Sequence, residues 1–299
     1  MKVRFSGSMD ILKDYVVLTK PRIVLMLLLT ALVGMVFAAR GIPDFEVVVM
    51  VLVSGALASG GAQAINHGLE RDIDSQMIRT RRRPVASGRI SSHAALMFGV
   101  VLNVMAFAIL VTSVNVISAV LTLTATLIYV FVYTLGLKRS TPQNIVIGGA
   151  AGAIPPVVGW AAVTGGVGLP AVYLFAIIFF WTPPHFWALA LLAKDDYARA
   201  RIPMLPVVAS VRQTKIHILL YSLILVTLTL MFFTTQTVGW FYLAGVSILN
   251  VALIYYSYRL LKLPGIRGAR PAYLYSLLYL ALLFTIIAID GVSANYPQI

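Results

Sequence analysis

The chain has 299 residues, of which 60% are hydrophobic and 11% are charged, and its mean hydropathy is +0.92. These values lie far outside the range of soluble globular domains and place the chain among integral membrane proteins. The sequence contains no cysteine, which excludes disulfides, thiolate metal sites and the C-x-x-C-H attachment of haem. The net charge of +13 indicates basic loops that face lipid headgroups, and we expect no nucleic-acid partner.

Apolar runs of membrane-crossing length follow one another along the chain and predict an all-α membrane protein with nine transmembrane helices. The predicted spans are residues 23–39, 46–65, 92–113, 116–136, 144–163, 170–193, 216–235, 239–258 and 271–289. The segment before the first run is polar and basic, and no clear small-residue cleavage site follows that run. We therefore interpret the run as a retained span and not as a signal peptide.

Lysine and arginine are distributed unevenly between the predicted loops. All 23 except Arg40 fall in the N-terminal segment or in the loops after the even-numbered spans. Because basic loops stay on the cytoplasmic side, this pattern predicts a cytoplasmic N-terminus and a C-terminus outside, in the cell (plasma) membrane. The whole chain, 1–299, is interpreted as one membrane domain. Similar motif loops at about 66–91 and 194–215, four spans apart, indicate either a four-helix pseudo-repeat or a chance match.

Half of the ten acidic residues lie in two short clusters on the predicted cytoplasmic side. Asn66, Glu70 and Asp74 are spaced at i, i+4 and i+8, which predicts one face of a helix at the mouth of the bundle. The second cluster, Asp195 and Asp196, follows the sixth span. Mg²⁺ uses one or two carboxylates together with substrate phosphate oxygens, so the clusters are candidate magnesium ligands. The alternative is a solvated helix end.

Basic residues crowd the same side, and together with a metal ion they would hold a diphosphate and stabilise it as a leaving group. For most of them membrane topology alone is a sufficient explanation. The candidates beside the acids or at helix ends are Lys20, Arg22, Arg71, Lys138, Arg139 and Arg199. The sequence has no Walker A motif, nucleophile elbow or zinc-spaced histidine pair, and it indicates metal-assisted departure of a diphosphate inside the bilayer.

The end of the sixth span is rich in aromatic residues. They form either a belt at the membrane interface or a pocket in which ring faces stabilise a carbocation. His185 lies in this apolar run, about three turns before Asp196 on the same face of a continuous helix. An intramembrane histidine is a candidate functional residue, and a hydrogen-bonded structural role is its alternative. The candidate acceptor pocket consists of Trp181, His185, Trp187 and Tyr133.

Several segments resemble the UbiA-type intramembrane prenyltransferases. The resemblance covers about residues 12 to 285, and its main segments are residues 15–22, 66–89, 133–144, 148–160, 181–190 and 194–206. The segment with Asn66, Glu70 and Asp74 is similar to the family's first Asp-rich motif. The segments around His185 and Asp195 are more specific, since they resemble the branch that farnesylates protohaem IX.

The resemblance implies a nine-helix bundle around a lipid-open central cavity. It also implies a Mg²⁺-dependent transfer of the farnesyl group of farnesyl diphosphate to the vinyl group of haem b, which gives haem O and diphosphate. Asn66, Glu70, Asp74 and Asp195 would then hold Mg²⁺ on the diphosphate. The implied partners are farnesyl diphosphate, haem b and membrane lipid, with hand-over of the product to haem A synthase or to terminal oxidase assembly.

The chain departs from the family pattern in places. Glu70 stands where the family has Asp, which keeps the charge but adds a methylene. Arg201 stands where Gly is expected, and the second cluster lacks the DxxxD spacing of other members. Two alternative functions stay open: a prenyltransferase with another acceptor, such as a quinone precursor or a chlorin, and a membrane transporter. Charges gathered at one end of the bundle favour an enzyme, because transporters place them near the bilayer centre.

Overall fold

The computed structural model describes residues 8–293, and every regular element in this range is helical. Nine spans within the same range are long and apolar enough to cross a membrane, which confirms the predicted fold class. The spans are α2 (Pro21–Ala39), α3 (Phe45–Leu69), α5 (Ser92–Ser113), α6 with η1 (Val116–Leu127 and Ile128–Leu137), α7 with α8 (Asn144–Ala153 and Pro155–Thr164), α9 (Leu169–Leu192), α12 (Val211–Thr234), α13 (Trp240–Lys262) and α14 (Ala269–Ser293).

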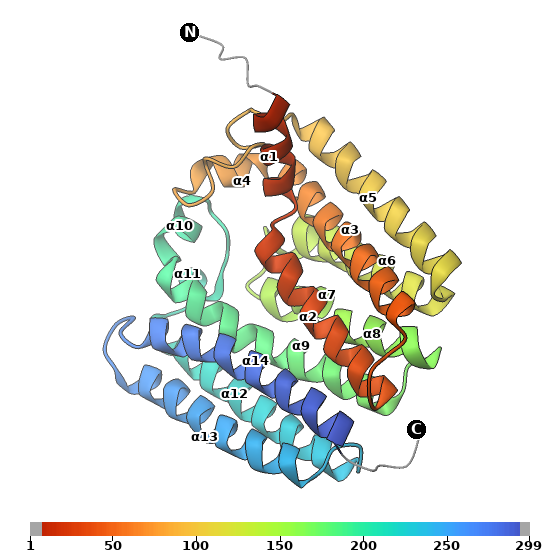
Figure 1. The fold of residues 1–299 in the computed structure, drawn as a ribbon. Helices are drawn as coiled ribbons and strands as arrows, with labels where there is room; N and C mark the ends of the chain where they lie inside the picture. The colour runs from red at the N-terminus through yellow and green to blue at the C-terminus, as the bar shows by residue number, and fades with distance from the viewer. Residues whose placement is uncertain (1–7, 294–299) are drawn as a thin grey trace.

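Four short helices complete the described chain: α1 (Ser8–Leu18), α4 (Arg71–Gln76), α10 (Lys194–Arg199) and α11 (Leu205–Val208). They gather at one end of the bundle, whereas the last turn of α14 lies at the other end (Figure 1). The two acidic clusters of the sequence therefore lie at the same end. The two chain ends, for which the sequence predicts opposite sides of the membrane, lie outside the described residues.

Four of the nine spans in the described range begin at a residue whose side chain caps the helix. Asp44, Ser91, Asn115 and Ser210 each accept a hydrogen bond from a backbone N–H in the first turn of the helix that follows. Ser210 forms a reciprocal capping box with Gln213. The cap at Asn115 separates α5 from α6 after a very short connection, at the position where the sequence predicts the break.

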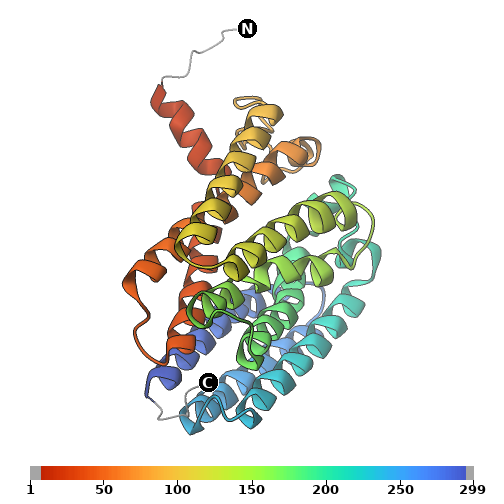
Figure 2. The ribbon, with the colours of Figure 1, turned by 90° about the vertical axis from the view of Figure 1, so that its right-hand side faces the viewer.

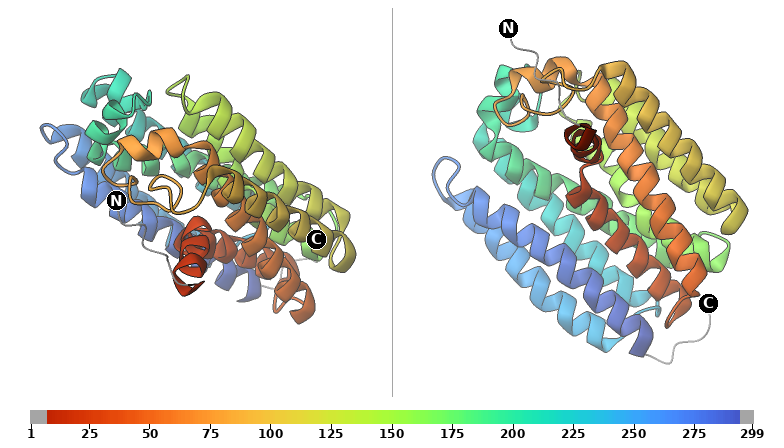
Figure 3. Two further views of the ribbon diagram at one scale, coloured as in Figure 1. Left: turned by 90° about the horizontal axis from the view of Figure 1, so that it is seen from above. Right: turned by 45° about the horizontal axis from the view of Figure 1, so that its top comes forward.

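The central helix of the arrangement is α9. It packs against α7 and α8 on one side and against α12 and α14 on the other, and α2 in turn contacts α8 and α14. Figures 2 and 3 show α12, α13 and α14 as one group, with α3, α5 and α6 on the opposite side of the molecule. The largest apolar core joins α2, α8 and α9 to the group of α12, α13 and α14 through fully buried side chains such as Phe37, Trp160, Leu174, Phe232 and Tyr279. This core fixes α2 relative to α9.

Glycine allows α2 and α8 to approach until their backbones touch. A Cβ atom placed on Gly34 would meet the carbonyl oxygen of Pro156, and one placed on Gly159 would meet the carbonyl oxygen of Ala31. Both contacts are closer than van der Waals distance, so only a residue without a side chain fits. In a membrane, where helices associate mainly by close packing, such contacts stabilise the pair.

The prediction of one continuous helix through Asn66, Glu70 and Asp74 is wrong. Helix α3 ends at Leu69, and Glu70, with φ of −104° and ψ of 19°, separates it from α4. The hydrogen-bond spacing nevertheless continues, because Glu70 N–H donates to Asn66 O at 3.0 Å and Asp74 N–H donates to Glu70 O at 2.8 Å. The chain therefore bends without losing the helical order of these three residues.

The prediction that His185 and Asp196 lie on the same face of one helix is also wrong. Helix α9 ends at Leu192, and Ala193 has a φ of −110° before α10 begins. Asp196 therefore lies on a separate short helix, and its direction is not set by α9. The backbone angles at this break, and not residue spacing, decide where the second acidic cluster lies.

We expect replacement of Gly159 by Ala to lower the thermal stability of the purified protein. The added methyl group forces α2 away from α8, and overpacking of this kind costs about 1–3 kcal/mol. The matched control is Gly152→Ala on α7, where an added Cβ meets no atom within 4 Å. The control should be neutral or slightly stabilising, since Ala favours helix. Equal melting temperatures of both variants in detergent would contradict the proposed close approach.

Candidate active site

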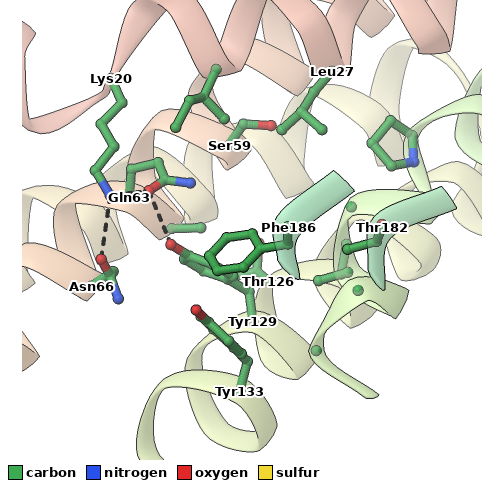
Figure 4. Close-up of a pocket in the computed structure, with 18 of the residues that line it drawn as sticks. Lys20, Leu27, Ser59, Gln63, Asn66, Thr126, Tyr129, Tyr133, Thr182 and Phe186 are labelled. Carbon is green, nitrogen blue, oxygen red and sulfur yellow. Dashed lines mark hydrogen bonds between the residues drawn. The ribbon is translucent and has the colours of Figure 1, made fainter. Parts of the chain in front are cut away.

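A cavity of about 490 Å³ lies between α2, α3, η1, α7, α8 and α9 (Figure 4). Its size is typical of a small-molecule site, and most of its lining is apolar. Polar groups gather at the end near α4, where the lining includes Lys20, Gln63, Asn66, Glu70, Asp74, Arg79, Arg83 and Lys138. The cavity thus combines an apolar body with a charged end.

The Lys20 ammonium group crosses from the start of α2 to the side chains of α3. Its Nζ donates to Gln63 Oε1 at 2.6 Å and lies 3.4 Å from Asn66 Oδ1 (Figure 4). Lys20 has a φ of 49°, a left-handed conformation that costs energy for a residue with a side chain. Burial, with the positive charges of Arg83 and Lys138, lowers the pKa of Lys20 to about 7. A bound anion beside it would favour the charged form.

The π-helical segment η1 supplies the opposite wall of the charged end. Thr134 Oγ1 donates to Tyr129 O, five residues earlier, and accepts from Asn66 Nδ2 at 3.2 Å. Tyr129 OH donates to Gln63 Oε1 at 3.0 Å, and the Tyr129 ring stacks on Tyr133 with centroids 5.6 Å apart. Segments of π-helix occur often at functional sites, because the wider turn redirects side chains. Here it places two aromatic faces against the cavity.

The two carboxylates of the cavity are almost completely buried, and each has a cationic partner. Glu70 is 1% exposed, and its two oxygens accept from Lys138 Nζ at 2.5 and 2.6 Å. Asp74 is 3% exposed, and both oxygens lie 2.9 Å from the same terminal nitrogen of Arg83. Since a buried unpaired charge is very costly, these pairs hold the site together. Both cations lie at the rim, where a bound anion could replace the carboxylates as their partner.

The donor set fits a Mg²⁺ ion that is completed by substrate. Among the residues that the structure describes, no group of three or more His, Asp or Glu side chains could hold a metal ion. Glu70 and Asp74 both line the cavity, and Mg²⁺ is commonly bound by one or two carboxylates plus phosphate oxygens and water. The protein side chains alone would hold such an ion weakly, and a diphosphate would supply the missing ligands.

The structure brings eight of the predicted site residues to the cavity lining: Lys20, Asn66, Glu70, Asp74, Tyr133, Lys138, Trp181 and His185. Seven others lie outside that lining: Arg22, Arg71, Arg139, Trp187, Asp195, Asp196 and Arg199. Arg139 pairs with exposed Asp72 at 2.6 Å, and Arg199 pairs with Asp196 at 3.0 Å. Asp195 is exposed. Their predicted roles as ligands of the metal or the diphosphate stay predictions.

Trp187 lies outside the cavity because of helix geometry. Side chains two positions apart on an α-helix point in directions about 200° apart. Trp187 therefore faces away from the cavity when His185 faces it. Its ring is 2% exposed and packs against Tyr221 and His217 at right angles. The aromatic end of α9 is therefore divided: Trp181 and Phe186 line the cavity, and other rings pack in the core.

Several cavity residues are absent from the sequence prediction. Gln63 lies three residues before Asn66, a helical spacing that could have identified it. Arg83 belongs to the motif loop, but its pairing with Asp74 depends on how the loop folds back. Tyr129 could not be assigned from sequence, since the π-helical turn that orients it leaves no clear pattern.

Residues 27–283 match the model of the UbiA prenyltransferase family. The chain belongs to this family. Relatives described as protoheme IX farnesyltransferase confirm the resemblance seen in the sequence. The protein of Marinobacter nauticus is 48% identical over 93% of this chain and 92% of its own length, and that of Symbiobacterium thermophilum is 49% identical over 95% of each.

Other relatives are longer than this chain. The protoheme IX farnesyltransferase of Thermus thermophilus is 50% identical over 278 residues, which are 93% of this chain and 46% of the relative. The chain spans about half the length of this relative and of the Roseiflexus castenholzii protein, of which it covers 53%.

Solved structures share the fold. A digeranylgeranylglyceryl phosphate synthase superposes with a TM-score of 0.80 at 17% identity, over 95% of this chain and 99% of the other. A UbiA homolog from Archaeoglobus fulgidus, solved with GPP and Mg²⁺, gives a TM-score of 0.64 at 18% identity, over 92% and 99%. These structures establish the UbiA fold of this chain.

We expect the Glu70–Lys138 pair to show strong coupling in stability. Lys138→Met alone leaves the Glu70 carboxylate buried without a partner, which should destabilise the protein by about 3 kcal/mol. The double variant with Glu70→Gln removes both charges and should regain most of that loss. Melting temperatures of the parent, both single variants and the double variant provide the test. Additive effects would show that the pair does not interact.

Proposed function

We propose that the chain transfers the farnesyl group of farnesyl diphosphate to the vinyl group of haem b, giving haem O and diphosphate. The observation that carries this proposal is one intramembrane cavity with two paired carboxylates and several cations at one end and an aromatic wall with a histidine along its body. Family membership and the relatives described as protoheme IX farnesyltransferase support it. The product would pass to haem A synthase or to terminal oxidase assembly.

In this proposal Glu70 and Asp74 hold Mg²⁺, with the Asn66 side chain beside them. When bound, Mg²⁺ supplies positive charge that stabilises diphosphate as a leaving group. The GPP and Mg²⁺ in the Archaeoglobus fulgidus homolog support divalent metal use. Lys138 and Arg83 release the two carboxylates and turn to the phosphate oxygens, so that every charge keeps a partner through the exchange.

The apolar body of the cavity receives the farnesyl chain. Departure of diphosphate breaks the allylic C–O bond, and the ring faces of Tyr129 and Tyr133 lie where they can stabilise the resulting cation. The haem vinyl group attacks C1 of the farnesyl cation and forms the new C–C bond. Water then adds to the cation left on the former vinyl carbon and loses a proton, which gives the hydroxyethylfarnesyl side chain.

The direct test is a reaction with purified components. Protein in detergent is mixed with labelled farnesyl diphosphate, haem b and Mg²⁺, and the pigments are separated by chromatography. We expect label in a haem O product, loss of the product with a chelator, and recovery with added Mg²⁺. Label in an added aromatic acid or chlorin instead of haem would overturn the assignment of the acceptor. Absence of any product, together with uptake of label by vesicles that contain the reconstituted protein, would favour a transporter.

Substitutions should distinguish the two cavity carboxylates, Glu70 and Asp74, from the exposed Asp72 by their effect on turnover. We expect Asp74→Ala or Glu70→Ala to reduce turnover at least 100-fold per folded molecule, beyond any loss of stability from the broken ion pair, since these carboxylates act on the leaving group. Glu70→Asp should retain most activity because it restores the family's residue. The matched control is Asp72→Ala in the same motif, which removes an exposed carboxylate outside the cavity and should retain activity. Parental activity of Glu70→Ala would refute its role as a ligand.

Asp195 requires its own measurement. We propose that the second acidic cluster takes part only if α10 moves toward the cavity, because Asp195 is exposed and lies outside the cavity lining. Loss of turnover in Asp195→Ala, with normal folding, would support this part of the proposal. Unchanged turnover would limit the metal site to Glu70 and Asp74.

We also propose that the end of the bundle with α1, α4 and α10 faces the cytoplasm. The absence of native cysteine allows single-cysteine variants without background. An impermeant thiol reagent should label Ser87→Cys only from the cytoplasmic side and Gly166→Cys only from outside. Labelling of Gly166→Cys from the cytoplasmic side of sealed vesicles would reverse the orientation.

A further inference from the structure

The imidazole of His185 is held by residues from two helices. Its ring stacks on Trp181, one turn earlier on α9, with centroids 4.2 Å apart and 18° between the planes. Ser276 Oγ of α14 lies 2.8 Å from His185 Nδ1, and the Tyr273 ring lies 5.0 Å from the imidazole. Trp181 Nε1 donates to the backbone carbonyl of Ser276 at 2.8 Å. The ring is therefore fixed both on its face and at its edge.

The hydrogen bonds of Ser276 determine which ring nitrogen carries the proton. A serine hydroxyl has one proton, and Ser276 Oγ donates it to the Tyr273 carbonyl at 2.6 Å. Toward His185 the same oxygen can only accept, so the network assigns the hydrogen to Nδ1. In a neutral imidazole with Nδ1–H, the free lone pair is on Nε2. His185 lines the cavity, and Nε2 is the nitrogen it can offer to a ligand.

This arrangement is the one that proteins use for histidines that bind metals. A ligating imidazole donates its second ring N–H to an oxygen, which fixes the tautomer and raises the basicity of the ligating nitrogen. Haem iron accepts histidine, cysteine, methionine or tyrosine as an axial ligand. A histidine that ligates haem iron is expected to donate its other ring N–H to an oxygen, and His185 Nδ1 has such a partner in Ser276 Oγ.

The alternative axial ligands of haem iron are cysteine, methionine, tyrosine and the other histidines. The sequence has no cysteine, and His185 is the one histidine of the four that lines the described cavity. The hydroxyl of Tyr129 donates to Gln63. Met77 is 3% exposed and packs in a small apolar cluster with Ile73. Tyr133 and Tyr197 also line the cavity, so the orienting hydrogen bond to Nδ1, and not elimination, selects His185.

We propose that His185 Nε2 binds the iron of the haem acceptor, and that Ser276 is a positioning residue that fixes the tautomer and direction of the imidazole. The inference rests on the proposed function and names the contact by which the acceptor is held. An Fe–N bond to α9 limits the porphyrin to rotation about that bond.

The test is a pair of absorbance titrations that do not depend on turnover. Purified parent, His185→Ala and Ser276→Ala are each titrated with haem b and with metal-free protoporphyrin IX. We expect His185→Ala to lose the histidine-ligated Soret band and at least 10-fold in haem affinity, with unchanged affinity for protoporphyrin IX. Ser276→Ala should weaken haem binding about 10-fold through loss of the orienting oxygen. Added imidazole should restore the ligated spectrum to His185→Gly.

The matched control is Ser222→Ala. Ser222 is a fully buried serine on α12 whose hydroxyl bonds to Ser257 at 3.0 Å, and it lies outside the cavity lining. Its removal deletes the same chemical group at another helix contact of the bundle. Both titrations should match the parent, which separates an orienting role of Ser276 from a general loss of buried hydrogen bonds.

The outcomes distinguish this inference from the proposed function. An unchanged haem spectrum and affinity in His185→Ala would overturn iron ligation, even if the parent makes haem O and the variant does not. Equal losses for haem and protoporphyrin IX would overturn it too, since they indicate ring packing only. Failure of the parent to convert haem b to haem O would instead overturn the proposed function, whatever the titrations give.

Discussion

Burial of charge in an apolar bundle is the constraint on which the site depends. Glu70 and Asp74 are nearly inaccessible, and in such surroundings an ionised carboxylate persists only with a partner. The partners come from different segments: Lys138 follows η1, and Arg83 lies in the motif loop after α4. The pairs therefore connect the end of α3 to two other parts of the chain. In the proposed reaction, the carboxylates and the cations would both find new partners on a metal diphosphate.

The backbone departs from regular helix next to the cavity. The bend at Glu70, the π-helical turn of η1 and the left-handed Lys20 all lie at the charged end. In a membrane such backbone is tolerated where protein groups or a cavity can satisfy its polar atoms. Lys20, Glu70, Tyr129 and Tyr133, which lie at these irregularities, all line the cavity. The departures from regular helix thus coincide with the groups to which the proposed chemistry assigns a role.

The helix α9 connects this charged end to the rest of the bundle. Its first half packs in the aromatic core with Phe232 and Tyr279, and its second half presents Trp181 and His185 to the cavity. Ser276 on α14 contacts both of these rings, through its hydroxyl and its carbonyl oxygen. The packing of α14 on α9 therefore sets the geometry of the aromatic wall. A shift between these two helices would alter the wall but not the position of Glu70, which lies between α3 and α4, or of Asp74 on α4.

The sequence by itself determined the nine spans, since membrane thickness and hydrogen bonding leave a long apolar run little choice but helix. It also predicted that Asn66, Glu70 and Asp74 lie together, and all three line the cavity, because helical spacing survives a small bend. Only the tertiary structure decided which cations meet these acids: Lys138 and Arg83 line the cavity, whereas Arg139 and Arg199 pair at the surface with Asp72 and Asp196. The sequence of a basic loop does not show whether its Lys and Arg residues only set the membrane orientation or also line the cavity. Likewise, the contact between Ser276 and His185 joins residues far apart in the chain, and it depends on how α9 and α14 pack, which no local pattern encodes.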